Sequence, residues 1–568
     1  MIERGYATLP DRARQVHFRR AGTGPPVVLV HASPGSSLAL EPLLLALSQR
    51  GRTAIALDSA GFGQSDPLPH DQQPSAGDYA SVLGDALDAL GLRQFDLYGT
   101  HTGAKIALEL ALARPLFVRF LLLDGIGLYT PEEQARQLAH YAPSLAPTWD
   151  GTHLVRAWSL RRDMALFWPW YDQTPSARRF VGVPPADVLH SQVVDILRGG
   201  DHYRGGYYAA FSHDTRAALP RLTVPTLIVF RGSDVITDHA QRLPALPPGV
   251  SVEVVPASGA ETQHIAERLL QRRDLGPLDN APPAAGQASL RTPLLTRAYV
   301  RTAAGVVHVR RGGAGPRRAV VLLHGSPRSS ASLAALASAL SEDRPVVAID
   351  TPGYGDSDAP TWPEPDQSLT PFAAVIGEVI RALTDGPVDV FGTHTGAALA
   401  LELAIAAPEL IHSVVLHGLP VFDDAERADL LEHYFPRLEP VWDGSHLLTA
   451  WHLCRNLLLF WPWYRQEPEA TLRYPLVPEA LHRDVLDLLK AGPSYAWAYR
   501  AAFLLNTHVV LPRLQVAALL ATTPGDPLQS HAARAQALRP DLAMVEVPSP
   551  SSPDQRTSAA IYRTFFQR

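Results

Sequence analysis

Gly99-Thr100-His101-Thr102-Gly103 is the stretch that decides the fold, and it recurs as Gly392-Thr393-His394-Thr395-Gly396. Each copy follows a short apolar run, which is typical of a buried strand. Each precedes an alanine- and leucine-rich run that ends at a proline, which is typical of a helix. Glycines beside the turn let the backbone adopt a strained conformation and let the helix approach the strand closely. The sequence therefore predicts a strand, a sharp turn with histidine at its apex, and a helix, twice.

The repeat covers almost the whole chain, because other stretches recur at a nearly constant offset. Trp149-Asp150-Gly151 matches Trp442-Asp443-Gly444, and the Leu-Phe-Trp-Pro-Trp-Tyr block at 166–171 returns at 459–464. A unit of this length is a whole domain and not a short solenoid repeat. We expect two domains, residues 1–290 and 291–568, with a linker at about 275–293 that is rich in Pro, Ala and Gly.

Composition excludes several classes of function. The chain has 568 residues, a net charge of −6 and 46% hydrophobic residues, which is typical of a globular protein without a nucleic-acid footprint. The single cysteine, Cys454, excludes an internal disulfide, and we expect it to be a small core residue. No hydrophobic signal core and no run of membrane-spanning length is present, so we predict a cytoplasmic protein without membrane contact.

Short hydrophobic runs alternate with helical segments in the same order in both copies, which predicts an α/β fold with a mostly parallel sheet flanked by helices. Helical, aromatic-rich segments interrupt this order at about 130–219 and 421–511, and we interpret them as caps. The predicted strands are 27–30, 53–57, 95–98, 118–123, 226–230 and 251–255 in the first copy, and 320–323, 346–349, 388–391, 414–416, 516–520 and 543–547 in the second.

Two further motifs identify the family that the chain resembles. His31-Ala-Ser-Pro-Gly35 and His324-Gly-Ser-Pro327 are similar to the H-G-x-P loop of the α/β-hydrolase branch that contains epoxide hydrolases and haloalkane dehalogenases. The stretches 58–66 and 350–358 match the D-x-x-G-x-G-x-S-D loop of the same superfamily. The resemblance implies two tandem α/β-hydrolase domains, each with a helical cap after the sixth strand. It says little about function, because this fold hosts many chemistries.

The chain departs from the family at the catalytic positions. The family places Ser, Asp or Cys on the elbow, an acid after the seventh strand and a histidine after the eighth. The acids are present as Asp234 and Asp526, but the elbow positions hold histidine. Ala260 stands where the late histidine is expected in the first copy, and the second copy has no histidine near its C-terminus. Acyl-serine chemistry is therefore excluded in both domains.

The resemblance leaves two interpretations of the elbow histidines open. In one, His101 with Asp234 and His394 with Asp526 form catalytic dyads that cleave or transform a small apolar carbonyl compound, such as an ester, thioester or lactone. In the other, histidine only fills the site of an inactive ligand-binding protein, or one domain is active and the other supports it. The backbone N–H groups that would polarise a carbonyl belong to Ala32, Thr102, Gly325 and Thr395.

The caps offer a second set of candidate residues, which either build the core of the cap or enclose an apolar or aromatic ligand. No metal-ligand spacing such as H-x-x-x-H occurs, and no organic cofactor is implied. The two domains are expected to be able to pair as an intramolecular pseudo-dimer. The candidates for ligand binding are Trp149, His153, Trp168, Trp442, His446 and Trp461.

The missing late histidine predicts a gap between the elbow and the acid. We expect the acid to reach the elbow histidine through water or a cap residue such as His153 in at least one copy. A direct contact would instead raise the pKa of the histidine and weaken it as a base at neutral pH. His264, which follows the expected base position, is interpreted as a surface residue on the last helix of the domain.

Overall fold

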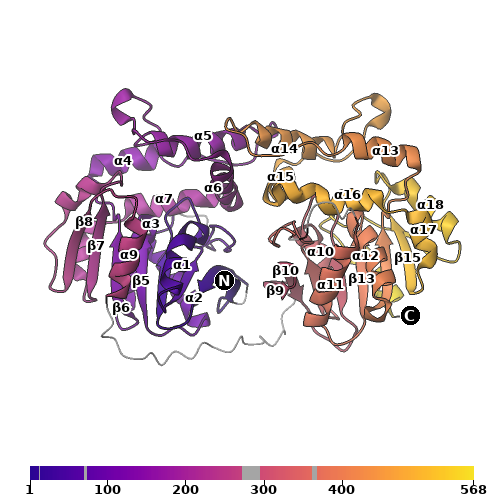
Figure 1. The fold of residues 1–568 in the computed structure, drawn as a ribbon, viewed down its shortest axis with the longest axis horizontal. Helices are drawn as coiled ribbons and strands as arrows, with labels where there is room; N and C mark the ends of the chain where they lie inside the picture. The colour runs from indigo at the N-terminus through magenta and orange to yellow at the C-terminus, as the bar shows by residue number, and fades with distance from the viewer. Residues whose placement is uncertain (12, 70–72, 272–294, 361, 363–367, 568) are drawn as a thin grey trace. The chain divides into compact units, whose positions relative to one another are not determined.

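A computed structural model describes residues 1–11, 13–69, 73–271, 295–360, 362 and 368–567 (Figure 1). The chain forms two compact units, Met1–Ala146 with Thr152–Gly286, and Pro147–Gly151 with Gln287–Arg568. The predicted linker at about 275–293 lies outside the described residues.

The described part of the first unit contains an eight-stranded sheet in the order β1-β2-β4-β3-β5-β6-β7-β8. Strands β3 to β8 pair in parallel, whereas β2 is antiparallel to both β1 and β4. The strands are β1 Glu3–Thr8, β2 Gln15–Ala21, β3 Pro26–Val30, β4 Thr53–Leu57, β5 Phe95–Thr100, β6 Val118–Asp124, β7 Thr226–Arg231 and β8 Val250–Val255.

The described part of the second unit repeats this topology in the order β16-β15-β14-β13-β11-β12-β10-β9. There β10 is antiparallel to both β9 and β12, and the other pairs are parallel. The strands are β9 Thr296–Thr302, β10 Gly305–Gly312, β11 Val320–Leu323, β12 Val346–Ile349, β13 Val388–Thr393, β14 Ile411–His417, β15 Ala517–Thr522 and β16 Ala543–Glu546.

The parallel strands agree with the sequence prediction, but the antiparallel pair that opens each unit was not predicted. These strands carry charged residues at positions that a hydrophobic pattern does not register. Arg20 on β2 pairs with Glu3 on β1 at 2.7 Å, and Arg19 is buried although it is charged. Cross-strand pairs of opposite charge thus support a strand whose sequence lacks a clean apolar alternation.

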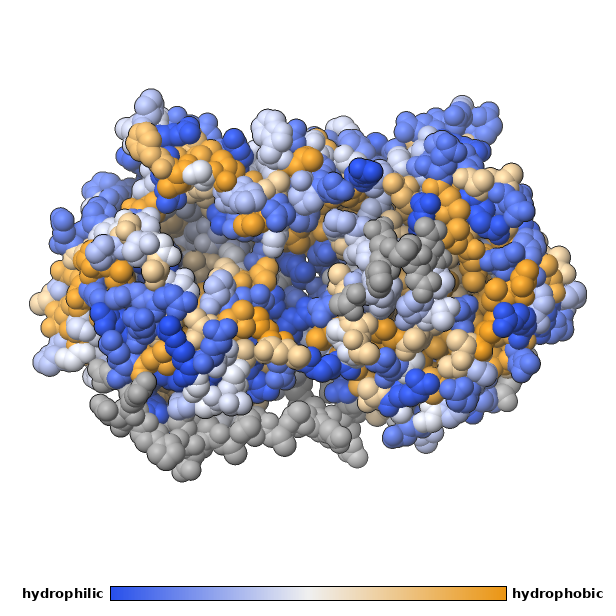
Figure 2. Space-filling view, viewed as in Figure 1, coloured by the Kyte–Doolittle hydropathy of each residue, from blue (hydrophilic) through white to orange (hydrophobic). Residues whose placement is uncertain are grey.

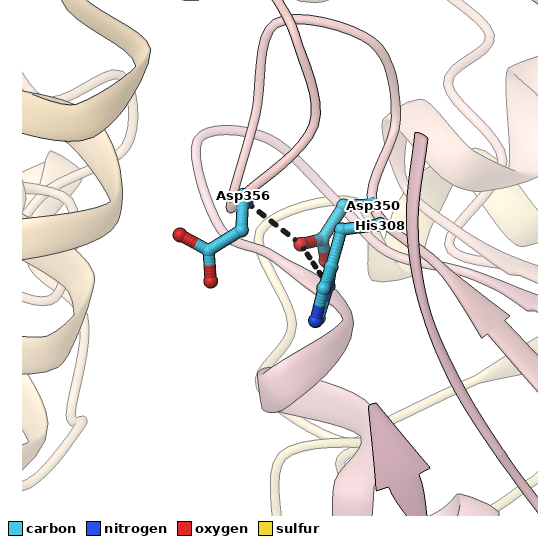
Figure 3. A group of neighbouring side chains, drawn as sticks. All are labelled: His308, Asp350 and Asp356. Atoms are coloured by element: carbon cyan, nitrogen blue, oxygen red, sulfur yellow. Dashed lines mark hydrogen bonds and ion pairs between the residues drawn. The ribbon is translucent and has the colours of Figure 1, made fainter. Parts of the chain in front are cut away.

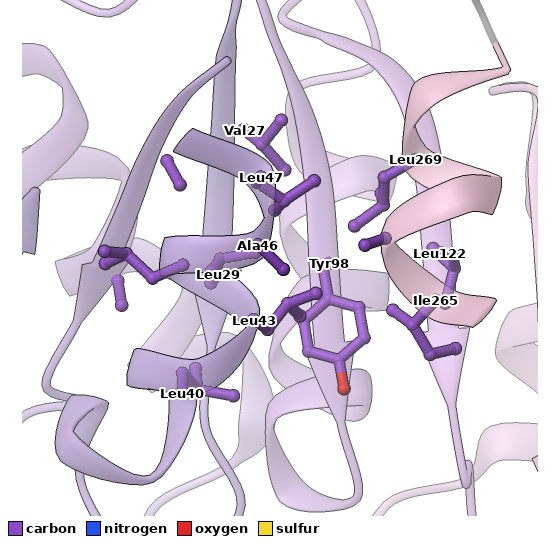
Figure 4. Close-up of a cluster of buried hydrophobic side chains, with 14 of the residues drawn as sticks. Val27, Leu29, Leu40, Leu43, Ala46, Leu47, Tyr98, Leu122, Ile265 and Leu269 are labelled. Carbon is purple, nitrogen blue, oxygen red and sulfur yellow. The ribbon is translucent and has the colours of Figure 1, made fainter. Parts of the chain in front are cut away.

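The sheet of the first unit is covered on one face by α1 (Glu41–Ser48) and α9 (Glu261–Leu270), as Figure 4 shows. Leu43 and Leu47 of α1 pack with Leu269 of α9 against Leu29 of β3 and Tyr98 of β5. Helices α2 (Ala76–Ala89) and α3 (Thr102–Ala113) pack together on the other face. Burial of both sheet faces explains the continuous apolar runs of these strands.

Helical insertions separate the sixth strand from the seventh in both units. Thr130 begins the first insertion with a capping box, since its side chain accepts from the N–H of Glu133 and Glu133 accepts from its N–H. The main helices are α4 Pro131–His140, α5 Thr152–Leu166, α6 Ala186–Gly199 and α7 Tyr203–Ser212 in the first unit, and α13 Asp424–His433, α14 Ser445–Asn456, α15 Pro478–Ala491 and α16 Ala496–Leu504 in the second.

No helix in the described ranges is long and apolar enough to cross a membrane. The face drawn in Figure 2 shows hydrophilic residues interspersed with smaller apolar areas in both units.

The elbow of each unit has a backbone that side chains rarely adopt. His101 has φ 50° and ψ −110°, His394 has φ 51° and ψ −113°, and no other non-glycine residue in the described ranges has positive φ. The turn is held by a strand–helix approach that only glycine permits. A Cβ at Gly103 would lie 2.3 Å from the carbonyl oxygen of Val30 in the neighbouring strand.

Replacing Gly103 tests this close approach. Gly103→Ala is expected to lower the free energy of unfolding of the first unit by about 2 kcal/mol or more, because the new methyl group overlaps strand backbone. Urea denaturation followed by circular dichroism measures the change. Gly182→Ala is the matched control, because a Cβ there meets no atom within 4 Å. Equal stability of the two variants would contradict the close approach.

Candidate active site

The structure brings each elbow histidine into direct contact with the acid that follows the seventh strand. His101 Nε2 lies 3.0 Å from Asp234 Oδ2. In the second unit, His394 Nε2 lies 2.9 Å from Asp526 Oδ2 and 3.1 Å from Oδ1. Our prediction of an intermediary in at least one copy was therefore wrong. The ring of the elbow histidine itself spans the distance between the elbow and the acid.

A glycine after the sixth strand makes room for this ring. A Cβ at Gly418 would lie 2.5 Å from His394 Cδ2, and a Cβ at Gly125 would lie 3.3 Å from His101 Cε1 and 2.8 Å from Asp234 Oδ2. Both glycines also have positive φ. The glycines in Asp124-Gly125 and His417-Gly418 were thus the sequence signal for a direct contact, because they leave space for the ring.

The contact changes the acidity of both partners in the first unit. Burial opposes protonation of His101, but the charge and hydrogen bond of Asp234 outweigh it and raise the pKa of His101. Burial alone would raise the pKa of Asp234, but His101 holds it below its ordinary value. The pair therefore stabilises the folded state between the two pKa values. This contribution is lost as pH rises through the pKa of His101 or falls through that of Asp234.

A cavity of about 370 Å³ adjoins the elbow of the first unit. His101 is 40% exposed toward this space, so one edge of its ring remains accessible. The cap contributes part of the wall, and several of the lining residues are aromatic. The aromatic residues lining the cavity are Tyr129, Tyr141, Trp168, Tyr207 and Phe211.

The second unit has a cavity of about 210 Å³ at the equivalent place. His394 and Asp526 line it, and Cys454 does as well, although that side chain is only 3% exposed. Arg328 and Asp484, which also line this cavity, form an ion pair of 2.9 Å. The aromatic residues in its wall are Tyr434, Trp461, Tyr474, Tyr499 and Phe503.

The structure separates the cap residues that we proposed for ligand binding. Trp168 and Trp461 line the two cavities. Trp149 and Trp442 are 71% and 76% exposed and line neither cavity. His153 and His446 are buried in α5 and α14 and also lie outside the cavity walls, so His153 is not an intermediary. His446 instead accepts a hydrogen bond from the N–H of Val441 within its own cap.

The predicted backbone donors all lie at the cavities. Ala32 and Thr102 line that of the first unit, and Gly325 and Thr395 line that of the second. Thr102 and Thr395 are the first residues of α3 and α12 (Thr395–Ala406), where backbone N–H groups have no partner inside the helix. His264 is on α9, as expected, and its Nε2 lies 2.9 Å from Glu253 Oε1.

The buried side chains behind the two dyads differ between the units, and this difference was not predicted from the sequence. In the first unit, buried Asp124 accepts from the Tyr98 hydroxyl at 2.6 Å and from Arg231 Nε at 2.9 Å. In the second unit, His417 and Thr523 replace Asp124 and Arg231 and lie 3.0 Å apart. Burial, together with the charge of His394, lowers the pKa of His417 to about 3, so this pair is neutral.

A separate cluster of His308, Asp350 and Asp356 has the spacing of a metal site, but its hydrogen bonds hold the loop at 350–358 in place (Figure 3). Asp350 accepts from His308 Nδ1 at 2.8 Å and from the Asp356 N–H at 2.9 Å. Burial would raise the pKa of Asp350, but His308 holds it well below its ordinary range. In the first unit, Gln64 donates the same backbone bond to Asp58, so the shared feature is the backbone N–H and not a third ligand.

Comparison with known proteins identifies the family. The model of the α/β hydrolase fold family matches residues 25–266 and 318–500. This chain belongs to that family. Both of its units carry the match, in agreement with the tandem arrangement that the repeated motifs predict. The elbow histidines thus lie at the turn between strand and helix in two α/β-hydrolase domains.

Curated relatives match over a part of their length. Haloalkane dehalogenase 2 of Mycobacterium tuberculosis (strain ATCC 25618 / H37Rv) is 33% identical over 121 residues, which cover 21% of this chain and 42% of the relative. The 2-hydroxymuconate semialdehyde hydrolase of Pseudomonas putida is 37% identical over 128 residues, 22% of this chain and 45% of the relative. The chain thus spans less than half the length of these relatives. An epoxide hydrolase structure from Vigna radiata has a TM-score of 0.38 at 17% identity, covering 48% of this chain and 98% of its own.

Removing the charge of Asp234 tests the electrostatic coupling. Asp234→Asn is expected to lower the pKa of His101, because the carboxylate is what favours the imidazolium. The pKa is measured from the pH dependence of the His101 ring signals in NMR spectra, assigned with His101→Gln. Asp238→Asn, which removes an exposed carboxylate paired with Arg242, is expected to leave that pKa in place. The same titration in both variants would show that Asp234 does not control His101.

Proposed function

We propose that this protein is a hydrolase in which an elbow histidine, oriented by the acid after the seventh strand, activates water against a small carbonyl compound such as an ester, thioester or lactone. The observation that carries the proposal is the direct contact of 3.0 Å in the first unit and 2.9 Å in the second. This contact gives the histidine an acid partner of the kind that orients the base in Ser-His-Asp sites.

The contact decides which ring nitrogen is available. Asp234 is ionised and accepts a hydrogen bond, so the proton of neutral His101 lies on Nε2. Nδ1 then carries the lone pair, and no described residue hydrogen-bonds to it. A base with a free lone pair at the edge of a cavity is the arrangement that general-base catalysis requires.

The reaction proceeds in two proton transfers. Nδ1 of His101 takes a proton from water while the water oxygen attacks the carbonyl carbon and the carbonyl electrons move to oxygen. The N–H groups of Ala32 and Thr102 stabilise the resulting oxyanion. When the oxyanion collapses, the bond to the leaving alcohol or thiol breaks and the imidazolium returns the proton to it. The products are a carboxylic acid and an alcohol or thiol, and no covalent enzyme intermediate forms.

A ligand-binding protein without catalysis is the second candidate, and one observation favours it. The pKa of His101 is raised, so a larger fraction of the histidine is protonated near neutral pH than in free histidine. An imidazolium is no base. If catalysis occurs in the first unit, its rate must therefore increase as pH rises through the pKa of His101.

Alanine variants of the elbow histidines distinguish the two candidates. Hydrolysis of p-nitrophenyl acetate, an acetyl thioester and δ-valerolactone is measured for His101→Ala, His394→Ala and the double variant. We expect the double variant to lose about 10²-fold or more of the turnover, which is typical of a lost general base. His264→Ala is the control, because that histidine pairs with Glu253. Wild-type turnover in the double variant, or no hydrolysis by the wild type, would favour the binding protein.

A further inference from the structure

Four cationic side chains line the cavity of the first unit, and the second unit has a neutral residue at each equivalent position. The pairs are Lys105 and Ala398, Arg161 and Cys454, Arg179 and Leu472, and Arg231 and Thr523. The equivalence rests on shared structure. For example, Arg179 and Leu472 both donate their backbone N–H to the leucine that begins the same Leu-Phe-Trp-Pro-Trp-Tyr block, at 2.8 Å and 2.7 Å.

Lys105 is a buried cation without a carboxylate partner. It lies one helical turn after His101, and 2% of it is exposed. Its Nζ donates to the carbonyl oxygen of Ala210 and lies 5.1 Å from the ring centre of Tyr129. Burial lowers the pKa of Lys105 to about 7, so the side chain carries its charge below that pH, where the described residues supply no carboxylate to it. A buried charge of this kind is costly unless an opposite charge reaches it.

Arg161 is the second uncompensated cation. No hydrogen bond or ion pair joins its guanidinium to another residue in the described ranges. Burial lowers its pKa below the usual range, and Asp195 acts on it only at longer range. Arg161 also lines an adjoining hollow that contains Asp187 and Asp195, so it lies at the junction of the two spaces.

The other charged groups of this cavity are already engaged. Arg231 pairs with buried Asp124, and Asp234 pairs with His101. Arg179 is half-buried and donates to the carbonyl oxygen of Met164 at 3.3 Å. The positive charge of Lys105 and Arg161 is therefore left without a counter-charge from the protein inside this cavity.

We infer that the cavity of the first unit binds a small organic carboxylate, held by Lys105 and Arg161 beside His101. A carboxylate supplies the missing negative charge and accepts several hydrogen bonds at once. The aromatic wall, including Tyr129 and Phe211, takes the apolar remainder of the ligand. The inference deepens the proposed function, on which it rests for the location of the site. The substrate of the first unit then carries a carboxylate beside the bond that is hydrolysed, and that of the second unit is neutral.

Isothermal titration of the full chain with unreactive probes tests the inference. We expect 3-phenylpropanoate to bind at one site per chain and about tenfold or more tightly than 3-phenylpropanamide, which has the same shape without the charge. Inorganic phosphate is expected to bind more weakly than the carboxylate, because it leaves the aromatic wall empty. Equal binding of acid and amide, no binding of the acid, or tighter binding of phosphate would each overturn the inference.

Two variants locate the site. Lys105→Met and Arg161→Met are each expected to weaken binding of 3-phenylpropanoate about tenfold or more, and to bring it close to that of the amide. Arg93→Met is the control, because it removes one positive charge from the exposed pair with Asp88. Wild-type affinity in both cavity variants would overturn the inference.

Thermal unfolding without ligand shows whether a variant loses binding because its fold is destabilised. Lys105→Met is expected to unfold at the same or a higher temperature than the wild type, because a buried unpaired charge is replaced by an apolar chain of similar length. Loss of binding in a variant that is at least as stable therefore reports on the ligand site. The binding result is also independent of turnover, so carboxylate binding without ester hydrolysis would contradict the proposed function and leave this inference standing.

Discussion

The left-handed backbone at His101 and His394 is the constraint on which the site of each unit depends. It directs the imidazole away from the helix that follows and across to the acid on the loop after the seventh strand. Such a conformation costs free energy in a residue other than glycine, and it persists only where the surroundings enforce it. The glycine-mediated packing of α3 against β3 supplies that enforcement in the first unit.

Sequence reasoning found the parts of the structure that repeat and missed those that depend on contacts between distant residues. The repeated motifs around His101 and His31, with the hydrophobic runs beside them, were sufficient to predict the parallel part of both sheets and the family. The direct contact with Asp234 was not predicted, because the family pattern placed a histidine after the eighth strand. Whether a side chain spans a gap depends on the space around it, and Gly125 provides that space.

The cap residues show the same limit. Trp149 and Trp168 both belong to the aromatic-rich sequence of the cap, yet Trp149 is exposed and Trp168 lines the cavity. Histidines 153 and 446 are polar residues in apolar surroundings, and this pattern fits a buried structural side chain as well as a ligand contact. Three-dimensional packing decides between the two, and the sequence of one chain does not contain that information.

The two units share one fold and one dyad geometry, but their cavities differ. Both retain the elbow, the acid and the glycine beside the ring, so the dyad does not distinguish them. The difference lies in the surroundings, where the buried pair of Asp124 and Arg231 in one unit corresponds to the neutral pair of His417 and Thr523 in the other. A duplicated domain can thus change the charge of its site without altering the geometry of its central pair.

The most direct test of the central claim is an NMR measurement of the proton between each elbow histidine and its acid in protein labelled with ¹⁵N-histidine. A ring N–H that donates to a carboxylate gives a signal far downfield and slow exchange with water. We expect downfield signals from Nε2 of His101 and His394, besides those of other histidine–carboxylate pairs such as His308 with Asp350. Asp234→Asn is expected to remove the His101 signal, and Asp526→Asn the His394 signal. A downfield spectrum that neither substitution changes would contradict a direct contact between the elbow histidines and their acids.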